Sequence, residues 1–305
     1  MAKRPEPIMI AELGCVHVQE MDRAKMLIEL AAGSGADIVK FQKRNPIECV
    51  HKDLQDKPHP NPQFAWGDTY LEHRQNLEFN IEQHKELKKT CEDFGVEYAS
   101  SVWDMTSAKE IISLNPNHIK IPSACNSHWE MMELLYDAYD GMIHISTGMT
   151  DIADRDNICQ FLTKDERYMR TIVYHCTSRY PCPVEELYLD EIFRLTFKYP
   201  HIGFSNHNPN IATDIAAFTH GATYFERHFI DKRSFRHTDA QASLEPHDFM
   251  DLSRNLDDIY KALQPKPELM TDIERVEQHK LRAYEPHGLD HKKYPTDYPP
   301  LKIIG

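Results

Sequence analysis

The chain has no long uninterrupted hydrophobic run. No stretch approaches the roughly 20 apolar residues that a membrane-spanning helix needs. The apolar run within residues 1–14 is also too short for the hydrophobic region of a signal peptide. We therefore expect no membrane association and a cytoplasmic location.

Positive charge is scarce as well. The 305 residues include 35 Lys and Arg against 48 Asp and Glu, which gives a formal net charge of −13. Such a chain is repelled by phosphate backbones and by anionic membrane surfaces, so no nucleic-acid partner is expected. An anionic ligand would have to be bound by a few well-placed cations.

Two common sequence signatures are missing. The seven cysteines are odd in number and form no CxxC motif, so we expect free thiols in a reducing compartment. No glycine-rich turn follows the first apolar run, which argues against an open sheet that binds a dinucleotide.

Short β-rich runs alternate with amphipathic segments along most of the chain. Apolar residues at helical spacing predict helices at 21–35, 81–95, 127–139 and 247–263. Strict alternation of strands and helices predicts an α/β fold with a parallel sheet, and the number of strands favours a (β/α)8 TIM barrel over a doubly wound open sheet. The expected strands are 7–12, 37–42, 96–101, 118–123, 142–148, 171–177, 201–207 and 223–229.

The barrel is expected to occupy residues 1–263 as a single catalytic domain. Residues 43–80 form a long insertion after the second strand, and their Pro and His content predicts an ordered loop or lid. Residues 264–305 are expected to form a short irregular C-terminal tail and no separate domain.

Polar residues stand at the carboxyl end of nearly every expected strand, where barrel enzymes place their chemistry. One polar strand end alone indicates only that the chain meets water there. Two lysines within strands of an acidic chain are harder to explain, because a lysine that faces a barrel interior needs an anionic partner. These strand-end residues are Glu12, Lys40, Gln42, Ser100, Ser101, Lys120, Ser123, Ser146, Thr147, His175, Thr177, Ser205, His207, Glu226 and His228.

The last two strands end in histidines. Glu226 and His228 are two residues apart in a strand, so they point to the same side. His207 ends the preceding strand at the same height, and neighbouring strands lie about 4.8 Å apart. Both imidazoles could therefore bind one divalent metal ion, although a single buried histidine is more often a core residue. Nitrogen and oxygen ligands suit manganese foremost, with magnesium, cobalt or zinc as alternatives.

Seven short motifs then occur in order, each on an expected strand or directly after it. They are IAELG, GADIVKFQ, IKIPSA, ISTGM, HCTSRYP, IGFSNH and FERHF followed by ASLEP. In these motifs the chain resembles the sialic acid (nonulosonate) synthase family over about residues 6–263. The resemblance implies a metal-dependent, aldol-type condensation of phosphoenolpyruvate with the aldehyde of an N-acetylated amino sugar. The products would be a sialic-acid-like 2-keto acid and phosphate.

The resemblance also implies roles for individual residues. His207 and His228 match the metal ligands, and Tyr180 and Asp239 are expected to contact the sugar. The predicted catalytic residues are Glu12, Glu226, Asp239 and His175, and which carboxylate activates water stays open. The predicted substrate-binding residues are Lys40, Gln42, Ser101, Lys120, Ser123, Ser146, Tyr180 and Ser205.

The chain departs from the family pattern on the sugar side. Cys125 stands where many relatives carry an acidic residue, and Trp103 stands where many carry Phe. We also expect no C-terminal antifreeze-like domain, which in relatives reaches the sugar site of a partner subunit.

The insertion is predicted to close the sugar site instead. It carries Trp66, Tyr70, His73 and Arg74, which can stack on a sugar and hydrogen-bond to it. A homodimer or larger homo-oligomer is expected. Two alternative functions stay open: a lyase that forms a Schiff base through Lys120 or Lys40, and a non-catalytic barrel subunit.

Overall fold

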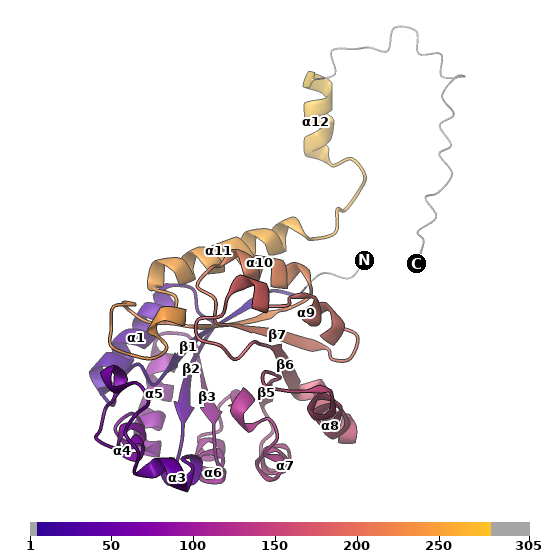
Figure 1. Ribbon diagram of the computed structural model, residues 1–305. Helices are drawn as coiled ribbons and strands as arrows, with labels where there is room; N and C mark the ends of the chain where they lie inside the picture. Colours follow the sequence, from indigo (N-terminus) through magenta and orange to yellow (C-terminus); the bar gives the residue numbers. More distant parts are fainter. Residues whose placement is uncertain (1–4, 282–305) are drawn as a thin grey trace, which may run out of the picture. The chain divides into compact units, whose positions relative to one another are not determined.

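The computed structural model describes residues 5–281. The described residues up to Leu263 form one compact unit, in which eight parallel strands close into a barrel (Figure 1). The strands pair in chain order, and β1 also pairs with β8. The predicted TIM barrel is therefore confirmed. The strands are β1 (Ile8–Gly14), β2 (Ile38–Lys43), β3 (Glu97–Val102), β4 (His118–Ile121), β5 (Met142–Ser146), β6 (Thr171–His175), β7 (His201–Asn206) and β8 (Tyr224–His228).

Helices surround the strands on the outside (Figure 1). Capping side chains define several of their starts: the Asn80 side chain accepts a hydrogen bond from the backbone N–H of Gln83, and Asp104 accepts one from Ser107. The helices that follow the strands are α1 (Met21–Gly33), α5 (Ile81–Asp93), α6 (Met105–Ser113), α7 (Trp129–Ala138), α8 (Ile152–Thr163), α9 (Asp190–Leu195), α10 (Ala212–Thr219) and α11 (Pro246–Ala262).

The strands alternate between two environments. In β2, Val39 and Phe41 face the helices and join the main hydrophobic core. Ile38 belongs to a smaller cluster with Ile10 and Tyr174, which fills the barrel interior. The same period of two then turns the polar residues that come later in each strand towards the interior. Apolar side chains thus fill the bottom of the barrel, and polar ones gather at its carboxyl end.

The Tyr174 side chain closes the barrel interior beneath these polar groups. Its ring centre lies 4.6 Å from the Lys120 Nζ atom. Its hydroxyl group is 3.0 Å from His144 Nδ1, and the other nitrogen of that ring is 2.9 Å from His118 Nδ1. A Cβ atom at Gly203 would lie 2.3 Å from the Tyr174 ring, so only glycine at that position of β7 leaves room for this ring.

The insertion contains more regular structure than the predicted loop. Asn45, His51 and Thr69 each cap a short helix with their side chains, which explains why brief helical turns form between the prolines. The elements are α2 (Pro46–Cys49), α3 (Lys52–Gln55), η1 (Pro62–Phe64) and α4 (Tyr70–Gln75).

The described residues from Gln264 onward belong to a separate unit. Residues 264–305 were predicted to form an irregular tail, but the described part contains helix α12 (Asp272–Leu281). The prediction for residues 282–305 lies outside the described residues. Thr271 and Glu274 exchange hydrogen bonds between side chain and backbone at the start of α12, and Lys266 forms an ion pair with Glu274. This local capping pattern was overlooked in the sequence.

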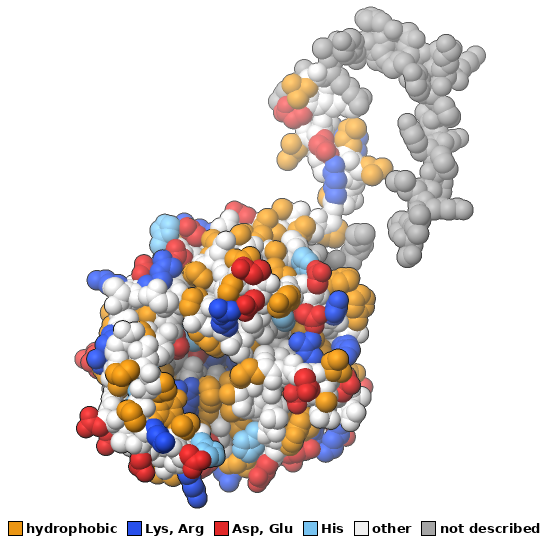
Figure 2. Space-filling model, in the orientation of Figure 1, with side chains coloured by type: hydrophobic (Ala, Val, Ile, Leu, Met, Phe, Trp, Pro, Cys, Tyr) orange, Lys and Arg blue, Asp and Glu red, His pale blue; other side chains and the backbone are white. Residues whose placement is uncertain are grey.

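The surface carries side chains of mixed character (Figure 2), and the cysteines are free thiols as predicted. Acidic, basic and hydrophobic side chains are interspersed over the face of the barrel that Figure 2 shows. All seven cysteines are free, as predicted. None of the helices between residues 5 and 281 combines the length and the apolar character that crossing a membrane requires.

Candidate active site

A cavity of about 230 Å³ opens at the carboxyl end of the barrel strands. The alternation described above brings side chains from all eight strands or the loops that follow them to one place. Twelve of the fourteen predicted site residues line this cavity: Glu12, Lys40, Gln42, Ser101, Lys120, Ser123, Ser146, Tyr180, Ser205, His207, Glu226 and His228.

Four buried charged residues, Glu12, Lys40, Lys120 and Glu226, form what we call the charge cluster. Lys40 forms an ion pair with Glu12, and its Nζ atom lies 3.7 Å from Glu226 Oε2. Lys120 Nζ lies 2.5 Å from the other carboxylate oxygen, Glu226 Oε1. At most 6% of any of these four side chains is exposed. Each lysine therefore has the anionic partner that its burial requires.

The cluster perturbs the protonation of its members. Burial alone would raise the pKa of Glu226, but the charges of Lys120 and Lys40 outweigh burial and hold that pKa well below its usual range. Burial lowers the pKa of Lys120, and the neighbouring Glu226 carboxylate opposes this effect. Glu226 therefore stays ionised and keeps both ammonium groups in place.

Neutral donors and acceptors surround the charges. Lys40 Nζ donates a hydrogen bond of 2.8 Å to Ser101 Oγ, and Ser205 Oγ donates one of 3.1 Å to Glu226. Gln42 Nε2 donates one of 2.8 Å to Glu12. Two further hydroxyl groups, of Ser123 and Ser146, line the same cavity. The result is a small site of fixed cations and hydroxyl groups that matches a compact anion.

The two predicted metal ligands lie side by side at the rim, with ring centres 5.6 Å apart. His207 Nδ1 lies 2.9 Å from the Thr177 carbonyl oxygen, which can only accept, so the proton is on Nδ1 and Nε2 has a free lone pair. Burial, aided by His228, lowers the pKa of His207 to about 3, and the ring is neutral. His228 Nδ1 is buried without a hydrogen-bond partner, 3.9 Å from Asp239 Oδ2.

These two imidazoles suit a metal ion, but they stand without a third protein ligand. Between residues 5 and 281, no group of three or more His, Cys, Asp or Glu side chains is arranged to hold a metal ion. A metal bound by His207 and His228 would need water or substrate oxygens to complete its coordination.

A second cavity of about 230 Å³ adjoins the first. We call it the outer chamber. Gln42, Trp103, Tyr180 and His228 line both spaces. Asp239, predicted to contact the sugar, lies in the outer chamber and does not line the inner cavity.

Four residues of the insertion line this chamber: Arg44, His73, Arg74 and Leu77. That the insertion closes the sugar site stays a prediction. Arg74 Nη2 donates a hydrogen bond of 2.9 Å to the Tyr70 hydroxyl oxygen, whereas Trp66 lies outside the lining.

His175 lies outside both cavities. Tyr174 takes the inward position of β6, so the next residue faces outward, where it stacks on Phe204. His175 Nε2 is 2.6 Å from the Leu187 carbonyl oxygen, and burial lowers the pKa of the ring. This contact indicates a structural role for His175 outside the site, in place of the predicted catalytic role.

Cys125 stands at a departure from the family pattern, and it is likewise absent from the lining of the inner cavity. Its Sγ atom is 3.5 Å from the Trp103 carbonyl oxygen.

The sequence analysis missed several lining residues. Ser178 and Cys176 line the inner cavity, and both lie within the HCTSRYP motif that already contributed Tyr180. Arg44 and His237 line the outer chamber. Arg44 lies two residues after Gln42 and could have been found by continuing the alternation, whereas His237 lies in a loop without periodic spacing.

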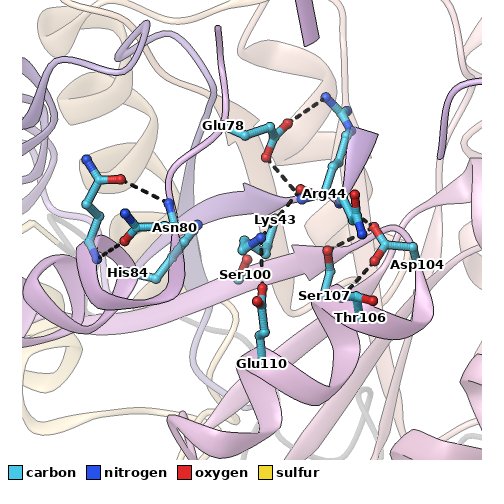
Figure 3. Close-up of polar contacts among 12 residues, drawn as sticks. Lys43, Arg44, Glu78, Asn80, His84, Ser100, Asp104, Thr106, Ser107 and Glu110 are labelled. Atoms are coloured by element: carbon cyan, nitrogen blue, oxygen red, sulfur yellow. Dashed lines mark hydrogen bonds and ion pairs between the residues drawn. The ribbon is translucent and has the colours of Figure 1, made fainter. Parts of the chain in front are cut away.

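Arg44 contacts three side chains. Its guanidinium lies 3.8 Å above the Trp103 ring, and Nη2 donates a hydrogen bond of 2.6 Å to Gln42 Oε1. Nη1 is 3.6 Å from Glu78 Oε1, and Glu78 also accepts a hydrogen bond from the Arg44 backbone N–H (Figure 3). Arg44 thus connects the insertion side of the outer chamber to the charge cluster through Gln42.

Comparison with known proteins places the chain among enzymes. The model of the NeuB family matches residues 27–267. The chain belongs to the NeuB family. It is 30% identical over 257 residues to the N-acetylneuraminate-9-phosphate synthase of Homo sapiens, a match that covers 84% of this chain and 70% of that protein. It is also 30% identical over 259 residues to the N,N'-diacetyllegionaminic acid synthase of Campylobacter jejuni, covering 84% of this chain and 77% of that one.

Solved structures agree on the fold. The N-acetylneuraminic acid synthetase of Leptospira borgpetersenii superposes with a TM-score of 0.76 over 92% of this chain and 94% of that one, at 22% identity. The family model and the two relatives confirm the predicted family and the predicted enzyme class, a carbon–carbon-forming synthase.

Removing one carboxylate should show how strongly the charge cluster depends on pairing. Glu226→Gln leaves two buried ammonium groups without their shared partner. We expect it to lower the free energy of unfolding by about 3 kcal/mol, measured by urea denaturation at neutral pH. Adding Lys120→Met to Glu226→Gln should recover part of this loss, because Lys120 is the lysine left without a carboxylate, whereas Lys40 keeps its ion pair with Glu12.

Glu186→Gln provides the control, because Glu186 forms its ion pair with the exposed Arg179. Exposed pairs contribute less than about 1 kcal/mol. A loss for Glu226→Gln no larger than that of Glu186→Gln would contradict the pairing described here.

Proposed function

We propose that this NeuB-family enzyme condenses phosphoenolpyruvate with the open-chain aldehyde of an N-acetylated amino sugar, giving a sialic-acid-like 2-keto acid and phosphate. One observation carries the proposal: the inner cavity combines two buried lysines with five serine hydroxyl groups in an otherwise acidic chain. Phosphoenolpyruvate is a compact anion with a phosphate and a carboxylate, and such groups are bound best by preorganised cations and hydroxyl donors.

Charge balance supports a divalent metal as part of the same site. The positive charges of Lys40 and Lys120 are balanced by the negative charges of Glu12 and Glu226, so the charge cluster alone has no net charge. A multiply charged anion therefore calls for further positive charge nearby. We propose that His207 and His228 hold a divalent ion, manganese foremost, which when bound polarises the aldehyde oxygen as a Lewis acid.

The chain's own residues account for the rest of the reaction. Lys40 and Lys120, with the serine hydroxyl groups, hold phosphoenolpyruvate so that its C3 atom faces the outer chamber, where the aldehyde enters. The C3 atom forms the new carbon–carbon bond, water adds to C2, and phosphate leaves with the bridging oxygen as the C2–O bond breaks.

The two glutamates of the charge cluster have different roles in this proposal. Glu226 is a poor proton acceptor because its pKa is held low. It acts by fixing the lysines, and Glu12, which Gln42 orients, is the carboxylate we assign to the attacking water.

One observation favours the alternative of a Schiff-base lysine. Burial lowers the pKa of Lys120, as a nucleophilic amine requires. Its contact with Glu226 at 2.5 Å, however, favours the protonated form, which cannot attack a carbonyl group. The two mechanisms differ in their need for metal and in whether borohydride traps an adduct. The homodimer and the cytoplasmic location stay predictions.

The bond that breaks can be followed with an isotope. Phosphoenolpyruvate labelled with heavy oxygen in the C–O–P bridge should give labelled inorganic phosphate and unlabelled keto acid, because the C2–O bond is cleaved. Mass spectrometry of both products measures this. Label retained in the keto acid would mean P–O cleavage and a different reaction.

Metal removal tests the second part of the proposal. His207→Ala and His228→Ala should each lose bound manganese, measured by elemental analysis, while the barrel keeps its circular dichroism spectrum. His51→Ala, at an exposed histidine of the insertion, should retain the metal. Chelation should stop turnover of the parent enzyme, and manganese should restore it. Full turnover in excess chelator, together with borohydride trapping of a pyruvate adduct on Lys120, would replace this proposal by the Schiff-base mechanism.

A further inference from the structure

Two buried histidines in the barrel interior have no part in the proposed reaction. His118 and His144 lie on the neighbouring strands β4 and β5, and neither lines the inner cavity or the outer chamber. Burying two imidazoles costs free energy unless their nitrogens are hydrogen-bonded, and apolar side chains would fill the same space without that cost. The partners of the two rings therefore indicate what the rings do.

The two imidazoles connect four consecutive strands through one chain of contacts. His118 Nε2 lies 3.2 Å from Glu97 Oε2, at the start of β3. His118 Nδ1 is 2.9 Å from His144 Nε2, and His144 Nδ1 is 3.0 Å from the Tyr174 hydroxyl oxygen on β6. We call Glu97, His118, His144 and Tyr174 the relay. It passes from the exposed Glu97 at the amino end of the barrel to the Tyr174 ring below the charge cluster.

The hydrogen bonds of the relay run in one direction. Burial lowers the pKa of both histidines, so each ring is neutral, with one donor and one acceptor nitrogen. The Glu97 carboxylate accepts, which puts the proton of His118 on Nε2 and leaves Nδ1 to accept from His144 Nε2–H. His144 Nδ1 then accepts from the Tyr174 hydroxyl group. The phenol is thereby fixed as a donor, and its ring cannot turn without breaking the chain.

The ring at the end of the relay contacts a substrate-binding lysine. Lys120 Nζ lies 4.6 Å from the centre of the Tyr174 ring, within the range of a cation–π interaction. Because the phenol donates to a chain that ends on a carboxylate, its ring is richer in electrons and attracts the ammonium group more strongly. Gly203 lies against the ring from β7, where a Cβ atom would collide with it. The ring is thus held between the relay and the opposite wall.

We propose that Tyr174 is a positioning residue for Lys120, and that the relay fixes the ammonium group of this lysine in the phosphoenolpyruvate site from the opposite end of the barrel. The inference rests on the proposed function, because Lys120 must hold phosphoenolpyruvate for its position to matter. Tyr174 does not line the inner cavity, so it acts on the substrate only through Lys120. Changes in the relay should therefore weaken binding of a substrate that the relay does not touch.

Substitutions along the relay test this by calorimetric titration with phosphoenolpyruvate in the presence of manganese. Tyr174→Phe keeps the ring and removes its hydroxyl group, whereas His144→Leu removes both central hydrogen bonds. Each should raise Kd by about three- to tenfold, within the range that a desolvated cation–π contact supports. Because the two residues act through one relay, the double variant should bind about as well as the weaker-binding single variant.

Tyr98→Phe provides the matched control. Tyr98 is also buried on a barrel strand, and its hydroxyl oxygen is 2.7 Å from Nδ1 of the buried His84. It belongs to the main hydrophobic core between strands and helices, away from the barrel interior. The control loses a hydrogen bond of the same kind and should lose comparable stability in urea denaturation. Its Kd for phosphoenolpyruvate should equal that of the parent, which a general effect of destabilisation would not allow.

The outcomes separate the relay from the proposed function. A parent enzyme that does not bind phosphoenolpyruvate would overturn the proposed function and this inference with it. Parent-like Kd in folded Tyr174→Phe and His144→Leu proteins would overturn the relay alone, and so would losses that add in the double variant. A shared, non-additive loss of affinity that Tyr98→Phe does not show supports the inference.

Discussion

The ion pairs between two lysines and two glutamates inside the barrel are the constraint on which the site depends. Removing four charged groups from water costs several kcal/mol per ion, and only close pairing offsets that cost. Glu226 touches both lysines, and Glu12 holds Lys40 from the other side. Because the strands that carry these residues are adjacent or face one another across a closed barrel, the fold holds the charges in place without a ligand.

The surroundings of the charge cluster follow from this arrangement. Tyr174 closes the interior below Lys120, and Gly203 leaves space for its ring. Above the cluster, Gln42 connects Glu12 to Arg44, which in turn packs on Trp103. The chain of contacts passes from the barrel interior to the outer chamber. The inner cavity presents balanced charges and hydroxyl groups, whereas the outer chamber presents mainly donors.

The period of two in the strands explains how much of the site the sequence could predict. It fixes which residues face the interior, so Lys40 and Gln42, or Glu226 and His228, could be placed together from spacing alone. His175 shows the limit: the carboxyl end of β6 was recognised, but the inward position belongs to Tyr174. Motif order added residues such as Tyr180 that follow a strand and have no periodic signal.

Such reasoning reached only part of the outer chamber. Much of its lining comes from the insertion and from the loop after β8, where side-chain direction depends on packing between segments far apart in the sequence. Arg74 could be named as a residue of the insertion, but its hydrogen bond to the Tyr70 hydroxyl group is a property of the folded chain. His237 and the short capped helices of the insertion likewise became visible only in three dimensions.

Calorimetric titration with phosphoenolpyruvate tests the central claim, that the charge cluster is a binding site for this anion. The parent should bind it in the presence of manganese, and Lys40→Ala and Lys120→Ala should each weaken binding by about thirtyfold or more, as expected when a buried charge loses its partner. Lys164→Ala, at an exposed ion pair with Glu133, should bind as the parent does. Parent-like affinity in folded Lys40→Ala and Lys120→Ala proteins would contradict the account, because the two ammonium groups would then have a purely structural role.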